Sequence, residues 1–148
     1  MQLGAGRLTR NYLKGDPYTA KSLTTLEEHI EDQLDSLTRS LATFEKSIAA
    51  GTSKTFRTLV KLSQNLYPKL GPTLTLEALE VMVPKIQQLT LDERKELPSV
   101  SAERAQQLVA GAMVARQLMR TLKLTEILIC PWALREGIVL HRLDWIER

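Results

Sequence analysis

The sequence has little cysteine, few aromatic residues and no long apolar run, and each shortage excludes a class of protein. The single cysteine, Cys130, permits no internal disulfide, which is typical of a reducing compartment. Aromatic residues make up only 5% of the chain, so there is little material for stacking against nucleic-acid bases. No apolar stretch approaches the roughly 20 residues that a membrane span needs. We therefore expect a cytoplasmic protein with neither a nucleic-acid nor a membrane partner.

What is present is the composition of one ordinary globular domain. The chain has 148 residues, of which 43% are hydrophobic and 25% charged. The net charge of +3 comes from basic residues spread along the chain, a balance that tolerates an anionic partner. His29 and His141 lack metal-ligand spacing with any cysteine or carboxylate cluster. The sequence therefore predicts no metal site.

Apolar spacing predicts most of the chain to be helical. Steps of three and four residues predict a helix over residues 23–44, with Thr24 and Glu27 spaced as a capping box at its start. Further helices are predicted over residues 54–66, over 76–86 after a cap at Thr75, and over 101–122. Pro84 should kink or split the second of these. Small residues around Gly111 predict that another part of the chain approaches closely there.

Two short segments are predicted to be strands. Residues 46–51 are a weak candidate, and residues 126–130 are a stronger one because isoleucines precede Pro131, which opens a final helix. The order strand, helices, strand, helix implies a parallel pair joined by a right-handed crossover. We therefore expect a helix-rich α/β domain whose short parallel strand pair is covered by the helix over residues 23–44 and by the final helix.

Ligands of such sheets bind beyond the carboxyl ends of the strands, which directs attention to "GTSKTF". Its candidate phosphate-binding residues are Gly51, Thr52, Ser53, Lys54 and Thr55. A glycine lets backbone approach a ligand, and the free N–H groups of the following helix attract anions. The alternative is that Thr52 or Ser53 merely caps the helix while Lys54 faces water. The spacing is not that of a Walker loop.

The second strand end carries Arg135, Glu136 and Gly137 in the first turns of the final helix. Arg135 is a candidate for an anion contact, or else forms a surface salt bridge with Glu136. Arg104 is a candidate ligand contact as well, or an ordinary arginine on a helix surface. Nothing in the sequence resembles a Ser–His–Asp or Cys–His arrangement.

Four segments in order point to a family: "LGAGRLTRNYLKGDP", "GTSKTF", "LPSVSAERAQQLVAGAMVA" and "ICPWALREGIVLHRLD". Together they resemble the exopolyphosphatase/guanosine pentaphosphate phosphohydrolase (Ppx/GppA) family over residues 3–144. That family is similar to the actin-like ATPases, with two ribonuclease-H-like domains and an active site in the cleft between them. The resemblance implies that residues 1–148 form a single partial domain, the C-terminal portion of the second domain. It places the phosphate loop at residues 51–55, with Gly111 and the "ALREG" segment beside the same cleft.

The resemblance also shows what this chain lacks. Family members have an N-terminal catalytic domain with an Asp-x-Gly-[ST] phosphate loop and a catalytic glutamate, and an Asp-x-Gly-Gly-Gly-Ser turn precedes the region matched here. Glu27, Glu45 and Glu136 match none of these positions. We therefore expect part of an enzyme that releases terminal phosphate from polyphosphate or guanosine pentaphosphate, inactive alone because hydrolysis needs a general base. No catalytic residue and no cofactor are assigned to this chain, and Mg²⁺ is left as an option for the full-length enzyme.

Other interpretations remain open at this stage. The chain is alternatively a non-catalytic polyphosphate-binding module or a helical protein-interaction module. The resemblance further implies a missing central strand between the predicted pair and a strand represented by residues 1–6. The edge at residues 46–51 would then be unpaired, and open edges invite pairing with another chain. We therefore expect a homo-oligomer or a complementing N-terminal half.

Overall fold

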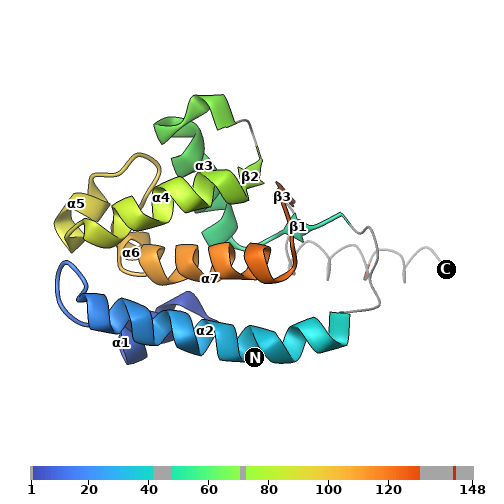
Figure 1. The fold of residues 1–148 in the computed structure, drawn as a ribbon. Coiled ribbons are helices and arrows are strands. Elements are labelled where there is room, and N and C mark those ends of the chain that lie inside the picture. Colours follow the sequence, from blue (N-terminus) through green and yellow to red (C-terminus); the bar gives the residue numbers. More distant parts are fainter. Residues whose placement is uncertain (1, 42–47, 71–72, 131–141, 143–148) are drawn as a thin grey trace.

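A long central helix organises the computed structural model, which describes residues 2–41, 48–70, 73–130 and 142. Helix α7 (Leu108–Thr121) lies between α1 (Ala5–Tyr12) and α2 (Ala20–Leu41) on one side and α4 (Leu76–Gln88) on the other (Figure 1). Because neighbours surround it, α7 is buried on several faces and is rich in small residues there. The expectation of a strand at residues 1–6 is wrong, since α1 already begins at Ala5.

Helix α2 confirms the predicted helix over residues 23–44 within the described part of the chain. Leu26, Ile30 and Leu34 are fully buried, each contributing roughly 1.5–3 kcal/mol by leaving water. The predicted capping box is wrong because the helix begins earlier, where Thr19 Oγ1 accepts a hydrogen bond from Ser22 N. The helix packs mainly on α7 and α1, so the expectation that it covers the sheet is also wrong.

The first two helices after β1 begin where the sequence predicts. Helix α3 (Lys54–Leu66) is confirmed, and a 3₁₀ turn, η1 (Pro68–Leu70), follows it. Thr75 caps α4 by accepting a hydrogen bond from Ala78 N, and α4 continues unsplit through Pro84. Helix α5 (Leu91–Lys95) is short and opens with a complete capping box.

The predicted helix over residues 101–122 is wrong in one respect, because it is two helices. Helix α6 (Ala102–Ala105) ends before α7 begins at Leu108. Between them, the carbonyl of Gln106 accepts hydrogen bonds from Thr9 Oγ1 and Tyr18 Oη, both at 3.3 Å. These contacts come from residues far along the chain, so the local sequence pattern does not reveal the break.

The sheet has three short strands in the order β1-β3-β2. β1 (Ala50–Gly51) runs parallel to β3 (Glu126–Ile129), which confirms the predicted pair. β1 is shorter than predicted, and residues 46–47 lie outside the described residues. The antiparallel β2 (Leu74–Thr75) was not predicted, because only its pairing with β3 distinguishes it from a loop. Helices α3 and α4 pack against this small sheet.

Candidate functional site

Two backbone N–H groups in the first turn of α3 are available for an acceptor from outside the described residues. Ser53 is the cap, and its Oγ accepts a hydrogen bond from Phe56 N at 3.2 Å, as the capping alternative predicted. No acceptor within the described ranges contacts the amides of Lys54 or Thr55. The first turn contains no acidic residue. Free amides at the positive end of a helix attract an anion, which the helix itself does not supply.

Two residues of the predicted loop, Gly51 and Thr55, have packing roles. A methyl group added at Gly51 would lie 3.0 Å from Phe56 Cγ and 3.2 Å from Ile127 Cγ2, so this buried glycine is required by its own neighbours. A methyl group added at Gly111 would lie 2.6 Å from Thr55 Cγ2. The close approach predicted at Gly111 is therefore made by Thr55, and this contact joins the start of α3 to α7.

A groove opens beside the same turn and brings two predicted residues together. It has a volume of about 410 Å³ and lies between α3 and residues 99–104, which include most of α6. The lining residues are Lys54, Arg57, Thr58, Lys61, Ser99, Ser101, Glu103 and Arg104. Lys54 and Arg104 thus line the same groove, although 50 positions separate them in sequence. Gly111 is buried and does not line it, and Thr52 is exposed.

Sequence reasoning missed Arg57, Lys61 and Ser99 at this groove. The spacing of Lys54, Arg57 and Lys61 places all three on one face of α3, a signal that was available. The opposite wall was not readable in advance, because Ser99 adopts a left-handed backbone conformation with φ of 66°. The predicted contacts Arg135, Glu136 and Gly137 lie outside the described residues.

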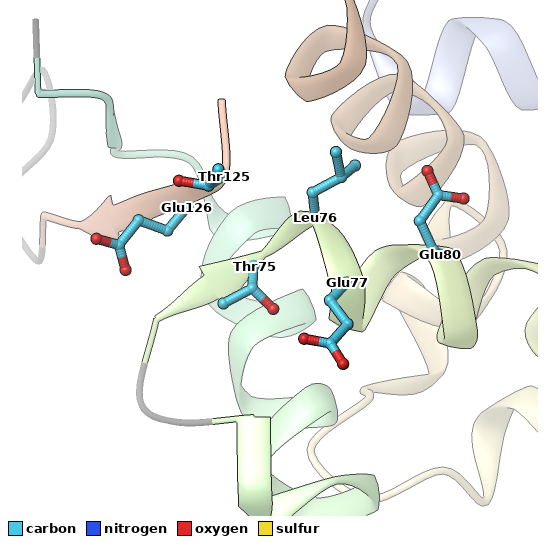
Figure 2. A pocket seen from close by; sticks show the side chains of 6 residues that line it. All are labelled: Thr75, Leu76, Glu77, Glu80, Thr125 and Glu126. Carbon is cyan, nitrogen blue, oxygen red and sulfur yellow. The ribbon is translucent and has the colours of Figure 1, made fainter. Parts of the chain in front are cut away.

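A second, acidic pocket lies at the other edge of the sheet. It has a volume of about 530 Å³, and its lining includes Glu77, Glu80 and Glu126. Figure 2 shows these three carboxylates pointing away from one another. Glu80 accepts two hydrogen bonds from Arg120, both at 2.6 Å, which raises the pKa of that guanidinium, and Glu126 accepts one from Thr73 Oγ1. This pocket therefore holds ion pairs and hydrogen bonds rather than a converging ligand set.

Neither hollow fits a divalent cation. The described parts of the chain contain no group of three or more His, Cys, Asp or Glu side chains that converges as a metal site. The groove beside α3 holds one carboxylate, Glu103, among four cations, the opposite of what Mg²⁺ requires. No helix within the described ranges is long and apolar enough to cross a membrane.

Nearly the whole chain is similar to proteins of one known family. A profile of the Ppx/GppA phosphatase family matches residues 1–145. The chain is 40% identical to Exopolyphosphatase 1 of Mycobacterium leprae over 149 aligned positions, covering 97% of this chain and 44% of that protein. It is 41% identical to Exopolyphosphatase 1 of Mycobacterium tuberculosis, covering 97% of this chain and 43% of that protein. The chain thus spans less than half the length of these relatives.

Solved structures share the fold. The crystal structure of the Aquifex aeolicus Ppx/GppA family member superposes with a TM-score of 0.84 at 21% identity, covering 100% of this chain and 49% of that one. An exopolyphosphatase from Cytophaga hutchinsonii gives a TM-score of 0.82 at 18% identity, covering 97% of this chain and 48% of that one. At these identities the likeness shows the fold alone, whereas the family is shown by the sequence match. This chain belongs to the Ppx/GppA phosphatase family.

Proposed function

We propose that this chain is the C-terminal portion of an exopolyphosphatase/guanosine pentaphosphate phosphohydrolase-type enzyme. Its contribution is a phosphate seat at Gly51, Thr52, Ser53, Lys54 and Thr55, which binds oxygens of polyphosphate or of a guanosine polyphosphate. The parent enzyme releases the terminal phosphate, and this portion alone is inactive. The small sheet and its helices then belong to the second of two ribonuclease-H-like domains of the actin-like ATPase type.

The observation that carries the proposal is the start of α3, where the amides of Lys54 and Thr55 have no acceptor within the described residues and Lys54 lines an open groove. Phosphoryl transfer depends mainly on positioning and on electrostatic stabilisation of spread negative charge. Helix amides supply fixed donors, and a lysine supplies a point charge suited to phosphate. A cation in the first turn of a helix costs roughly 0.3–1 kcal/mol through the helix dipole. A bound anion removes that cost, which supports a ligand at this position.

The same residues do not make a complete active site. Hydrolysis needs a group that takes a proton from the attacking water. Glu27 is held in an ion pair by Arg116 at 2.9 Å and lies 3.8 Å from Arg120, so it serves the structure. We therefore assign the general base to the portion of the relatives that this chain does not span.

The unpaired edge of β1 indicates where a partner chain would bind. Within the described residues β1 pairs only with β3, and Ile48 beside it is 81% exposed. Leu128 on β3 is 44% exposed. An unpaired edge with apolar neighbours favours pairing with another chain. We propose that a complementing N-terminal half occupies this edge, and that a second copy does so in its absence. Elution as a stable monomer in light-scattering chromatography would contradict this.

Phosphate release tests the catalytic part of the proposal. The chain alone should release no phosphate from long-chain polyphosphate, and adding the N-terminal half of a full-length relative should restore release. Restoration separates part of an enzyme from the alternative of a non-catalytic binding module. Phosphate release by the chain alone at the rate of a full-length relative would contradict the proposal.

Binding of inorganic tripolyphosphate tests the seat itself. Lys54→Ala should weaken binding about tenfold, equivalent to ~1.4 kcal/mol, because a charge-assisted contact is lost. Lys21→Ala removes an exposed lysine outside the groove and is the matched control. A protein-interaction module would bind no tripolyphosphate. A Gly51 substitution is less informative, because its new side chain would collide with Phe56.

A further inference from the structure

Gly111 on α7 contacts the first turn of α3. A methyl group added at Gly111 would lie 2.6 Å from Thr55 Cγ2 on α3 and 3.5 Å from Ala5 Cβ on α1. Carbon atoms in favourable contact are about 3.5–4.0 Å apart, so α1 leaves room for that methyl group and α3 does not. The absent side chain of Gly111 therefore makes room for Thr55.

The Thr55 side chain has little freedom to give way. Thr55 is half-buried, and a β-branched residue in a helix is restricted at χ1. Its methyl group is joined to the Thr55 backbone nitrogen through Cβ and Cα alone. A push on the methyl group is therefore passed to the backbone of the first turn. The amides of Lys54 and Thr55, which have no acceptor within the described residues, lie in that turn.

Two glycines contact this turn from different elements. Gly51 ends β1, and a methyl group added there would lie 3.0 Å from Phe56 Cγ. Gly111 makes the corresponding contact with Thr55 from α7. Gly51 belongs to the proposed seat, whereas Gly111 is buried and does not line the groove. The placement of the amides thus depends on a residue outside the groove.

Helix α7 is a firm support for the turn. Val109, Ala110 and Ala112 beside Gly111 are fully buried, and α1, α2 and α4 all pack on this helix. Close-packed interiors leave little room for backbone or side chains to shift. Fixed donors bind an anion more tightly than mobile donors, because less ordering is required on binding. The contact with α7 therefore makes the start of α3 a more rigid set of donors.

We propose that Gly111 is a positioning residue for the phosphate seat. By admitting the Thr55 methyl group, it holds the amides of Lys54 and Thr55 where they donate to a phosphoryl oxygen. The inference rests on the proposed function, which supplies the seat. It goes further by giving a role in ligand binding to a buried residue of another helix.

A double-mutant cycle with inorganic tripolyphosphate as the ligand tests this role. Gly111→Ala pushes Thr55 away and Thr55→Ser leaves the methyl position empty, so each should weaken binding about three- to fivefold by misplacing the donors. Gly111→Ala/Thr55→Ser moves the methyl group from α3 to α7 and should regain binding to within about twofold of the wild type. Independent effects would instead multiply to a loss of about tenfold or more. Titration calorimetry gives the affinities.

Three further readouts separate positioning from stability and from charge. Ala110→Gly destabilises the same helix without adding a methyl group opposite Thr55, so it should bind within about twofold of the wild type. None of these variants removes a charge, so the affinity should keep its salt dependence, whereas Lys54→Ala should reduce it. Without ligand, the amide resonances of Lys54 and Thr55 should shift in Gly111→Ala and return in the double variant. Circular dichroism checks that each variant folds.

The outcomes separate this inference from the proposed function. Unchanged binding in both single variants, equal loss in Ala110→Gly, or losses that multiply in the double variant would overturn the inference and leave the seat standing. If Gly111→Ala does not fold, the double variant is compared with Thr55→Ser. Tighter binding by the double variant supports the inference, and equal or weaker binding overturns it. A wild-type chain that binds no tripolyphosphate overturns the proposed function and the inference with it.

Discussion

The helices α3 and α5 both begin with a hydroxyl cap, yet they treat the positive end of the helix in opposite ways. At α5, Thr90 and Glu93 form a capping box, and Asp16 Oδ1 accepts a hydrogen bond from Leu91 N at 2.7 Å. At α3, Ser53 is the one cap that the described residues provide, and Lys54 adds positive charge. One helix start is neutralised by the protein's own carboxylates, whereas the first turn of the other has no acidic residue, and this is where we propose that an external anion binds. The difference teaches that a helix start is open to an external anion where no carboxylate of the chain already occupies it.

The largest expected effect comes from removing the internal anion at α5. Asp16→Ala deletes the hydrogen bond to Leu91 N and the contact to Arg94, whose side chain is 1% exposed and lies over the Tyr18 ring. Leaving a buried guanidinium without its carboxylate should lower the free energy of unfolding by about 3 kcal/mol. Urea denaturation measures this.

The matched control is Asp92→Ala in the same helix. Asp92 pairs with Lys95 in water, and this contact lowers the pKa of Asp92. Exposed pairs contribute little, so this variant should unfold almost as the wild type does. Equal destabilisation by the two variants would mean that Asp16 has no special role at the start of α5.

Packing rather than charge fixes the start of α3, and Gly111→Ala tests that difference. The added methyl group would press on Thr55 Cγ2, and a β-branched side chain has little freedom to move. The collision should cost about 2 kcal/mol, of which the better helix propensity of alanine returns up to ~1 kcal/mol. Thr55→Ser removes the methyl group, so the double variant should regain the lost stability. A double variant no more stable than Gly111→Ala would refute this contact.

Lys54→Glu gives α3 the kind of start that α5 already has. An acid in the first turn should raise the free energy of unfolding by about 0.5 kcal/mol through the helix dipole. The same change should abolish tripolyphosphate binding, because a carboxylate then occupies the anion's place. Stability is read from thermal unfolding and binding from calorimetry. Loss of stability together with unchanged binding would show that the dipole at α3 is not the seat.

The smallest expected effect is a change in how the stability of the fold depends on pH. Hydrogen bonds from the Thr90 backbone N–H and then its hydroxyl hold the pKa of Glu93 below its ordinary value. A carboxylate with a lowered folded-state pKa stabilises the fold above its unfolded pKa, and this stability is lost as pH falls through the folded pKa. Glu93→Gln should therefore lose less stability than wild type between neutral pH and that acid window. If the urea midpoints of wild type and Glu93→Gln change equally with pH across this window, Glu93 does not contribute in this way.

The sequence predicted the elements that depend on local pattern. Periodic apolar residues located α2 and α3, and isoleucines before a proline located β3. Contacts between distant residues decided the rest. The break after α6 depends on hydroxyls of Thr9 and Tyr18, and β2 exists only through its pairing with β3. Neither dependence leaves a local signature.

The candidate site divides in the same way. "GTSKTF" located the start of α3, because a glycine, a cap and a lysine are adjacent in sequence. The role given to Gly51 was incomplete, since its missing side chain makes room for Phe56 and Ile127. The far wall of the groove was not predicted, because its position depends on how residues 99–104 return to α3. Individual residues of the site could be predicted from the sequence, whereas the surface that they form together could not.

Backbone amide resonances during a titration with inorganic tripolyphosphate test the central claim most directly. We expect the resonances of the Lys54 and Thr55 amides to shift first and to saturate together. Those of Leu91 and Glu93 should not shift, because these amides already donate to a carboxylate and a hydroxyl oxygen. Amides of Lys54 and Thr55 that do not move while the ligand shifts resonances elsewhere would contradict it.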